Sequence, residues 1–434
     1  MSVEAVRRVT RQPSARVRGA ATLLAAGGLC TAACDVPPPT AAAGGAPDAP
    51  GPGGCARGFV VVSSDYQSTS VALVGGDGTV LAPSLLSSGS AAPGLSTALG
   101  GDVVLPTSAP EGDEVVLLDR YPASVVTWVN VGTGAVRGQL SVATGFLANP
   151  HDYVAMDGDR AYSTRFESNA TPGSEPFDAG GDLLRIDPRR LAITGRIPLA
   201  PALDGEPGGP LPRPDRAVRV GGRILVVLGG YSPDFSTSVA ARVVAVDPSA
   251  AVIDQTLVLD GVHACSGLAL SPDGSEVAVA CSGDWGGDGT PDLDGSALVR
   301  VRTTPPLAEI ARTPAAELGG GPIGMSVSYA SATRVVLTTL GRFGDAAGPE
   351  QDDAVVELDL DAGTHRTLLR SGDEPYTIGD VSCDAACGVC LVADAGRDGG
   401  VLQRFVVGDS GLGQPAAIAL EDGIGLPPRR VATF

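Results

Sequence analysis

Short apolar runs, each ending in a turn, follow one another from about residue 56 to the end of the chain. Val and other β-formers dominate them, and their apolar positions lack the 3.6-residue spacing of an amphipathic helix. In the clearest unit, Cys265–Cys281, two apolar runs flank a Pro-Asp-Gly turn, which is the composition of a β-hairpin. Two further runs, Ser296–Arg302 and Ala308–Thr313, complete a set of four predicted strands.

This four-strand unit recurs along the chain. In most units a proline opens the first run and an aromatic residue closes the second. The opening markers are Pro93, Pro150, Pro214, Ala264, Pro322, Pro375 and Pro428. The closing markers are Tyr66, Tyr121, Phe166, Tyr231, Trp285, Phe343 and Ala395. About seven four-stranded units without intervening helices predict a β-propeller, whereas an array of two-sheet sandwiches is the alternative.

The first unit, Phe59–Ser88, shows only three predicted strands. We expect Pro428–Phe434 to supply its missing innermost strand, because sharing one blade between both ends of the domain leaves no free sheet edge. The predicted fold class is therefore all-β, a seven-bladed β-propeller of four-stranded blades over residues 56–434, closed by its N- and C-terminal strands.

The repeat resembles that of secreted bacterial YVTN-type propellers. This likeness is carried by Leu268–Val279, by Leu184-Arg-Ile-Asp-Pro and by Val244-Ala-Val-Asp-Pro. A second likeness, to lipoproteins of unknown function from high-GC, myxobacteria-like genomes, is carried by Asp119-Arg-Tyr, Asn149-Pro-His-Asp and Thr164-Arg-Phe. Both likenesses imply an exported propeller, and neither implies an activity.

Residues 1–33 have the pattern of a secretory signal peptide. Arginines precede the apolar stretch Ala20–Ala33, which is too short to span a bilayer. Thr31-Ala-Ala-Cys34 resembles the lipobox of bacterial lipoproteins, which implies acylation of Cys34. The family usually has Leu at the position of Thr31, so cleavage after Ala33 to give a free secreted protein stays open. Residues 34–55, rich in Pro, Gly and Ala, follow as a predicted linker.

These features predict an exported lipoprotein of the bacterial cell envelope, facing the periplasm or the cell surface. We expect it to contact the membrane through the lipid anchor only. A closed ring of blades can stand alone, so we expect a monomer.

The composition and the net charge exclude several classes of function. The 434 residues carry a formal net charge of −19, and all basic residues are arginine. Without lysine, Schiff-base and P-loop lysine chemistry are excluded, and three histidines are too few for a multi-histidine metal centre. An acidic surface repels nucleic acid, so no nucleic-acid partner is expected. The simplest role of this acidity is solubility.

Six cysteines lie outside the signal region: Cys55, Cys265, Cys281, Cys383, Cys387 and Cys390. An even number in an exported chain favours disulfides. Cys265 and Cys281 flank a hairpin and should pair. Cys383 and Cys390 flank the equivalent turn of the last blade, which leaves Cys387 for Cys55, although exchanges within this group of four stay open. A zinc site that includes Cys55 is a further alternative.

Loop lengths predict a recognition surface on one face of the propeller. Tight turns fall on the opposite face, and the long insertions are Glu167–Gly181, Ser232–Ser238, Asp284–Gly295 and Gly344–Asp353. The aromatic markers lie at the roots of these loops. Packing between neighbouring blades is the simpler explanation for them, and ligand recognition is the alternative.

Residues that open the innermost strands should ring the mouth of the central channel. These candidates for binding are His151, Asp152, Asp215, Arg216, His263, Tyr376, Arg429 and Arg430. Two histidines and two aspartates could support acid–base chemistry or metal-assisted hydrolysis, as in lactonase-like propellers. A polar mouth whose groups satisfy one another is the simpler explanation.

The loop Asp284–Gly295 resembles the calcium loops of integrin-like repeats, with candidate ligands Asp284, Asp288, Asp292 and Asp294. Gly286 departs from that pattern, and the terminal Glu of an EF-hand is missing, so an ordinary acidic loop is the alternative. Calcium is the only cofactor that the sequence suggests.

No catalytic motif stands out in the sequence. We therefore expect a non-enzymatic binding or scaffolding module that recognises a protein or glycan partner through its loop-rich face. A lactonase-like hydrolase with its site at the channel mouth is the alternative.

Overall fold

The computed structural model describes residues 54–434, apart from residues 111, 287–288, 345–347, 373, 397–398 and 422. The predicted signal peptide, the lipidation site Cys34, most of the linker and the candidate ligand Asp288 lie outside the described residues. In the part that is described, no helix is long and apolar enough to cross a membrane. The helices there are the short 3-10 elements η1 (Ala200–Leu203) and η2 (Ala315–Leu318).

Seven antiparallel sheets form the blades of a seven-bladed β-propeller, as the sequence predicts. In each blade the first strand is innermost. Blade 1 contains β29 (Pro428–Thr433), β1 (Phe59–Ser64), β2 (Thr69–Val74) and β3 (Val80–Ser87). Blade 2 contains β4 (Val103–Val104), β5 (Glu114–Asp119), β6 (Val125–Asn130) and β7 (Val136–Ser141). Blade 3 contains β8 (Pro150–Asp157), β9 (Arg160–Ser168), β10 (Gly180–Asp187) and β11 (Ala192–Pro198).

The remaining blades repeat this order. Blade 4 contains β12 (Pro214–Val220), β13 (Arg223–Leu228), β14 (Arg242–Asp247) and β15 (Val252–Val258). Blade 5 contains β16 (Cys265–Leu270), β17 (Glu276–Ser282), β18 (Ser296–Arg302) and β19 (Ala308–Pro314). Blade 6 contains β20 (Ile323–Ser331), β21 (Arg334–Thr339), β22 (Ala354–Asp359) and β23 (Thr364–Arg370). Blade 7 contains β24 (Ile378–Asp384), β25 (Val389–Asp394) and β26 (Val401–Gly408), with β27 (Gly411–Leu412) and β28 (Ala416–Ile418) paired to β26.

The blades pack through their middle strands. Every residue of β1, β2 and β17 is buried, whereas β15 alternates exposed and half-buried positions at the perimeter. A blade that packs on both faces needs apolar side chains in both directions, which explains the continuous Val-rich runs. Each pair of neighbouring blades shares one hydrophobic cluster, including the pair formed by blades 7 and 1.

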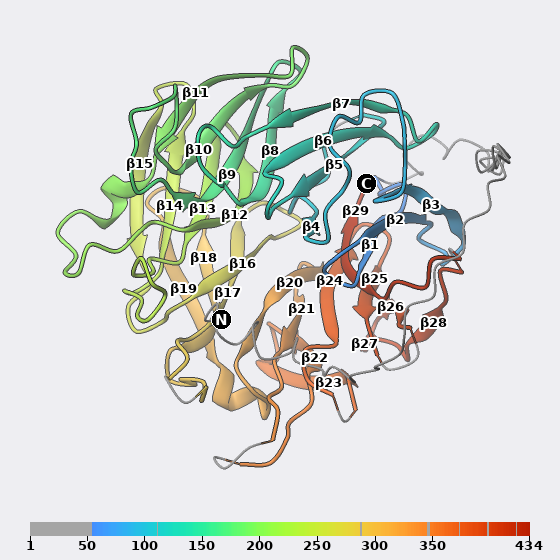
Figure 1. The fold of residues 1–434 in the computed structure, drawn as a ribbon. Coiled ribbons are helices and arrows are strands. Elements are labelled where there is room, and N and C mark those ends of the chain that lie inside the picture. Colours follow the sequence, from blue (N-terminus) through green and yellow to red (C-terminus); the bar gives the residue numbers. More distant parts are fainter. Residues whose placement is uncertain are drawn as a thin grey trace, which may run out of the picture. The chain divides into compact units, whose positions relative to one another are not determined.

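Blade 1 closes the ring by pairing strands from both ends of the described chain. Phe59 of β1 lies opposite Thr433 of β29, and Val61 lies opposite Val431. Figure 1 shows β29 beside β1, with the outermost strands at the perimeter. The predicted closure by N- and C-terminal strands is confirmed.

The prediction for the start of blade 2 is wrong. Pro93 was expected to open its innermost strand, but that strand is β4, which begins at Val103 and has two residues. The segment between β3 and β4 is rich in Gly, Ser and Ala and forms turns instead. Because β4 is so short, it leaves almost no apolar pattern in the sequence.

Aspartates at the ends of third strands cap the turns that follow, as expected. Oδ1 of Asp187 accepts hydrogen bonds from the backbone of Arg189 and Arg190. Asp247 and Asp359 make the equivalent pairs of hydrogen bonds in blades 4 and 6. These Asx turns keep one face of the propeller tight.

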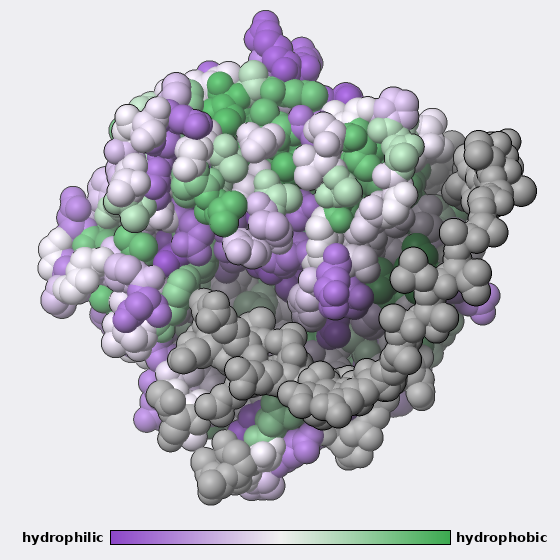
Figure 2. Space-filling view, viewed as in Figure 1, coloured by the Kyte–Doolittle hydropathy of each residue, from purple (hydrophilic) through white to green (hydrophobic). Residues whose placement is uncertain are grey.

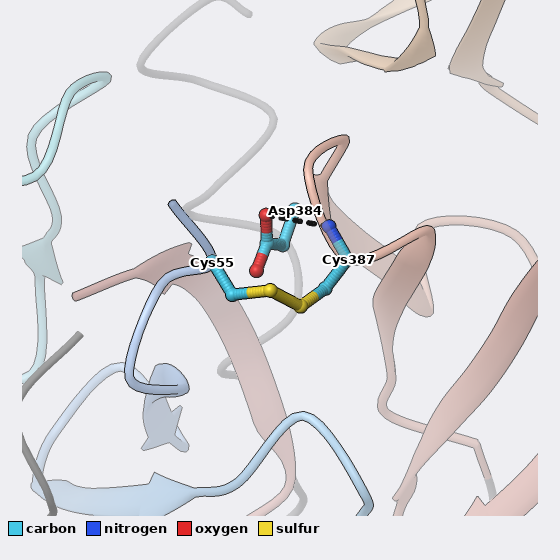
Figure 3. A group of neighbouring side chains, drawn as sticks. All are labelled: Cys55, Asp384 and Cys387. Carbon is cyan, nitrogen blue, oxygen red and sulfur yellow. Dashed lines mark hydrogen bonds between the residues drawn. A yellow bond between two sulfur atoms is a disulfide. The ribbon is translucent and has the colours of Figure 1, made fainter. Parts of the chain in front are cut away.

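The cysteines outside the signal region form three disulfides: Cys55–Cys387, Cys265–Cys281 and Cys383–Cys390. These are the pairings that the hairpin positions favour, and they leave no thiolate of these six for a zinc site. Figure 3 shows Cys55 bonded to Cys387, with Asp384 beside the bridge. Cys55 precedes β1, so this bridge ties the entry of blade 1 to blade 7. Three disulfides indicate an oxidising compartment, outside the cytoplasm.

The segments that join second to third strands lie on one face, which we call the loop-rich face. Its longest members are residues 169–179, 229–241, 283–295 and 340–353. The turns that join first to second strands are short, as at residues 158–159 and 221–222, except in blade 2, where residues 105–113 join β4 to β5. In a ring of equivalent blades, all second-to-third connections emerge on the same side, together with the entries to the innermost strands.

Candidate functional site

The central channel holds a cavity of about 210 Å³. Its wall comes from β12, β16, β20, β24 and β29 and from residues 105–108, which follow β4. Arg216 and Asp380 are its charged lining residues. The innermost strands β24 and β29 lie so close together that a side chain would not fit at Gly379. A Cβ atom added there would lie 2.1 Å from the carbonyl oxygen of Arg429. Figure 2 shows the propeller hollowed at its centre, with hydrophilic residues beside the hollow.

His151 lies at the start of β8 and contacts the neighbouring blade through Asp215 of β12. Its Nδ1 atom is 3.0 Å from Oδ1 of Asp215, and its Nε2 atom is 3.4 Å from Arg120. The imidazole ring stacks on Phe166, with ring centroids 4.3 Å apart. Burial lowers the pKa of His151, so the neutral ring donates from Nδ1 and accepts a hydrogen bond from Arg120 at Nε2. Both ring nitrogens and one ring face are therefore occupied.

Two further charges surround this pair. The Nη2 atom of Arg120 lies 2.5 Å from Oδ1 of Asp102. The guanidinium of Arg216 is 3.8 Å from Asp215 and donates to the carbonyl oxygens of Leu105 and His151. Burial opposes ionisation of Asp215, but the neighbouring His151, Arg216 and Arg120 outweigh it and hold its pKa below the usual value. The mouth is thus a network in which each of these charges has a partner.

Asp152 does not present its carboxylate to the mouth. The residue is fully buried and accepts hydrogen bonds from the backbone and hydroxyl of Thr107 and from the backbone of Ala217. It thereby joins blades 2, 3 and 4, and burial raises its pKa. This carboxylate is a structural crosslink between innermost strands.

On the other side of the channel, Arg430 and Arg429 point to different partners. The guanidinium of Arg430 pairs with Asp380 of β24 at 3.0 Å. The guanidinium of Arg429 lies 5.2 Å from the ring centroid of Tyr66 and donates to the backbone carbonyls of Tyr376 and Ser64. Tyr376 itself contributes its ring to a contact with Phe343.

His263 belongs to a separate cluster on the loop-rich face. The hydroxyl of Ser238 lies 2.7 Å from Oδ1 of Asp284 and 3.0 Å from Nδ1 of His263. The hydroxyl hydrogen goes to the carboxylate, so Oγ accepts from Nδ1–H and Nε2 keeps its lone pair. In the described part of the chain, no hydrogen bond reaches Nε2 of His263, and about a quarter of the side chain is exposed.

The candidate calcium loop is described only in part. Asp284 is engaged with Ser238, Asp292 accepts a hydrogen bond from the backbone of Asp294, and Asp288 lies outside the described residues. Among the residues described, the acid and cysteine side chains close enough to share one ion are Cys55, Asp384 and Cys387, whose sulfurs are already bonded. Calcium at this loop stays a prediction.

The aromatic markers divide into two kinds. The markers Phe166 and Tyr231 both contact the ring of Phe235, which is not itself a marker, in a chain of ring contacts that starts at His151. Arg213 lies over Phe166 and Phe235. Tyr66, Tyr121 and Phe343 are instead 60–63% exposed. The expectation that the markers pack between blades is therefore not met at Tyr66 and Tyr121, whereas Phe343, although 62% exposed, contacts the ring of Tyr376 at the entry to blade 7.

Backbone strain also gathers at the mouth. Asn149, Arg213, Ala264 and Tyr376, which lie one or two residues before innermost strands, have φ values of 49°, 49°, 52° and 62°. Side-chain-bearing residues rarely adopt this conformation, and it persists where the surroundings fix it. The same backbone conformation recurs in four blades. In each of them it sets the direction in which the backbone enters the innermost strand of the channel wall.

Several residues of this arrangement were missed in the sequence. Arg120, Asp102 and Asp380 carry the ion pairs of the mouth, and Ser238 links His263 to Asp284. Arg120 directly precedes the marker Tyr121, so its position in the repeat could have suggested it. The other three carry no pattern that separates them from ordinary surface residues.

The fold and this mouth define a seven-bladed β-propeller with a self-paired charged channel mouth and an aromatic loop-rich face. Among solved structures it is similar to the periplasmic gluconolactonase PpgL of Pseudomonas aeruginosa, at 14% identity and a TM-score of 0.53, over 86% of this chain and 98% of that one. A candidate 6-phosphogluconolactonase from Bacteroides fragilis also has a TM-score of 0.53, at 12% identity, over 86% and 96%.

A third neighbour is hydrazine synthase of Kuenenia stuttgartiensis, at 12% identity and a TM-score of 0.50, over 72% of this chain and 79% of that one. At these identities the likenesses show the fold alone. The sequence matches no protein-family model, and no curated protein matches it either. The neighbours are thus bacterial β-propeller proteins, some of them lactonases.

Proposed function

We propose that the protein is a binding module of the bacterial cell envelope that recognises a partner through its loop-rich face. The observation that carries this proposal is the exposure of Tyr66, Tyr121 and Phe343, each more than half open to solvent on that face. Large exposed aromatic side chains are typical of interaction sites, where they bury much area at little cost in conformational entropy.

The state of the channel mouth supports binding over catalysis. Asp215, Arg120 and both nitrogens of His151 already have partners, and His151 is buried. A general base needs a free lone pair within reach of substrate, which His151 does not offer in this arrangement. The ion pairs and hydrogen bonds at the channel mouth instead make the loop-rich face rigid.

A variant in which Tyr66→Ser, Tyr121→Ser and Phe343→Ser are combined tests the proposal. The full chain and this variant are immobilised and exposed to an extract of the producing cells and to a glycan array. A matched control combines Val258→Ser, Ile310→Ser and Val406→Ser, which are exposed apolar residues of β15, β19 and β26. We expect the first variant to lose a partner that the control retains. Identical binding by all three chains would contradict the proposal.

A second candidate function is hydrolysis at the loop-rich face, in line with the lactonases among the structural neighbours. The specific observation in its favour is the Asp284–Ser238–His263 cluster, in which the His263 side chain is about a quarter exposed and no hydrogen bond reaches its Nε2 in the described part of the chain. Glucono-δ-lactone, followed by acid release at constant pH, is the direct probe. His263→Gln should abolish turnover, whereas His365→Gln, on the exposed strand β23, should not. Absence of turnover by the full chain would reject this candidate.

We further propose that Cys34 carries the lipid that anchors the module in the envelope. The support is the lipobox-like sequence before it and the three disulfides, which require an oxidising compartment. The linker that follows would hold the propeller away from the membrane surface.

A further inference from the structure

The long loops of the loop-rich face share one property that the proposed function does not explain. The charged residues of 167–181, 232–238, 284–295 and 340–353 are all acidic except Arg342, which directly precedes Phe343. Of these, Glu175, Asp234, Asp292, Asp294 and Glu350 are exposed. The loops belong to blades 3, 4, 5 and 6, so the negative charge extends along four consecutive blades.

Aromatic rings on the same face already bind guanidinium groups. The Cζ atom of Arg213 lies 4.1 Å from the ring centroid of Phe235, and that of Arg429 lies 5.2 Å from the ring centroid of Tyr66. Cations are attracted to ring faces by the aromatic quadrupole. Tyr121 and Phe343 expose comparable ring surface without an arginine stacked on it in the described part of the chain.

We propose that the loop-rich face is a docking surface for a basic polypeptide segment, whose arginine or lysine side chains stack on Tyr66, Tyr121 and Phe343 and pair with the loop carboxylates. This inference rests on the proposed function and names its partner class. The argument is charge complementarity. A neutral glycan would form no ion pairs with the loop carboxylates, and a small molecule with a single amine would reach the carboxylates of one loop only. A polypeptide with several positive charges along its length can pair with the carboxylates of all four loops.

The net charge of −19 supports the same partner, because an acidic protein attracts basic chains from a distance. The same charge also makes nonspecific attraction the competing explanation. A test must therefore change the face while keeping the net charge equal between variants.

The experiment measures binding of a fluorescent nona-arginine peptide to the full chain at 0.15 M salt. One variant combines Glu175→Gln, Asp294→Asn and Glu350→Gln. Its control combines Asp159→Asn, Asp361→Asn and Asp409→Asn, which are exposed acids in tight turns away from that face. Each variant replaces three carboxylates with amides, so the net charge changes equally in both. We expect affinity to fall about tenfold in the first and less than twofold in the second, because only the first removes contacts.

The variant Tyr66→Ser, Tyr121→Ser and Phe343→Ser gives a second readout at unchanged charge, and we expect a further loss of about tenfold. Equal weakening by the two acid variants, or full affinity in the aromatic variant, would overturn the basic-partner inference. If the chain does not bind nona-arginine, yet loses a glycan or another envelope partner when the aromatics are replaced, the inference fails and the proposed function stands.

Discussion

The Nδ1 atom of His151 lies 3.0 Å from Oδ1 of Asp215, and this contact links the innermost strands of blades 3 and 4. Both side chains are nearly buried, so removing one partner leaves the other without compensation. Because Asp215→Ala leaves the buried Nδ1–H of the neutral His151 without an acceptor, we expect it to lower the free energy of unfolding by about 2 kcal/mol.

Urea unfolding of the full chain measures this loss. The control is Asp157→Ala, which removes the more exposed pair with Arg160 and should cost less than about 1 kcal/mol. Similar small losses in both variants would show that the mouth pair is not a structural link.

The disulfide Cys55–Cys387 should be the most stabilising covalent link. It joins residues 332 positions apart, whereas Cys265–Cys281 spans 16. In the chain-entropy model a long closed loop contributes about 5 kcal/mol and a short one about 3 kcal/mol. Replacing Cys55 and Cys387 with Ser should therefore lower the midpoint of urea unfolding more than replacing Cys265 and Cys281. The reverse order would contradict this expectation.

Ionisation of Asp119 should lower the free energy of unfolding as the pH rises. Its carboxylate accepts one hydrogen bond, from the backbone of Gly100, while its Oδ1 atom is buried without a partner. Burial raises its pKa to about 6, against about 4 in an unfolded chain. The folded state therefore keeps a proton that the unfolded chain releases, and the resulting stability is lost between about pH 4 and pH 6.

The variant Asp119→Asn removes this titration. We expect its stability relative to the wild type to be higher at pH 7 than at pH 4.5, measured by thermal unfolding at both values. A difference between the two proteins that is the same at pH 4.5 and pH 7 would show that Asp119 ionises normally.

Cys34 should decide whether the chain partitions with membranes. The full chain, expressed with its own N-terminus in a bacterial host, should enter the detergent-rich phase on phase separation. Cys34→Ala should move it to the aqueous phase without changing the propeller. If both chains partition alike, the lipid-anchor proposal is wrong.

The sequence was sufficient for the fold because propeller blades repeat. Buried second and third strands, such as β1 and β2, require unbroken apolar runs, and Asp187, Asp247 and Asp359 mark where the turns fall. The failure at Pro93 has a physical cause. A strand of two residues, β4, buries too little to impose a pattern.

The site was predictable only in part. His151, Asp215 and Arg216 follow from their positions at the starts of innermost strands. Among their partners, Arg120 has one local signal, its position before the marker Tyr121, whereas the long-range pairing of Asp102 leaves none. The 60% exposure of Tyr121 is likewise a property of the tertiary structure that sequence spacing does not determine.

We propose that this protein acts through its loop-rich face. Site-specific photo-crosslinking in the producing cells tests it most directly, with p-benzoylphenylalanine placed at Tyr121 on that face or at Asp159 in a tight turn on the opposite side. We expect a discrete crosslinked partner from position 121 and none from position 159. Crosslinks from position 159 alone would contradict it.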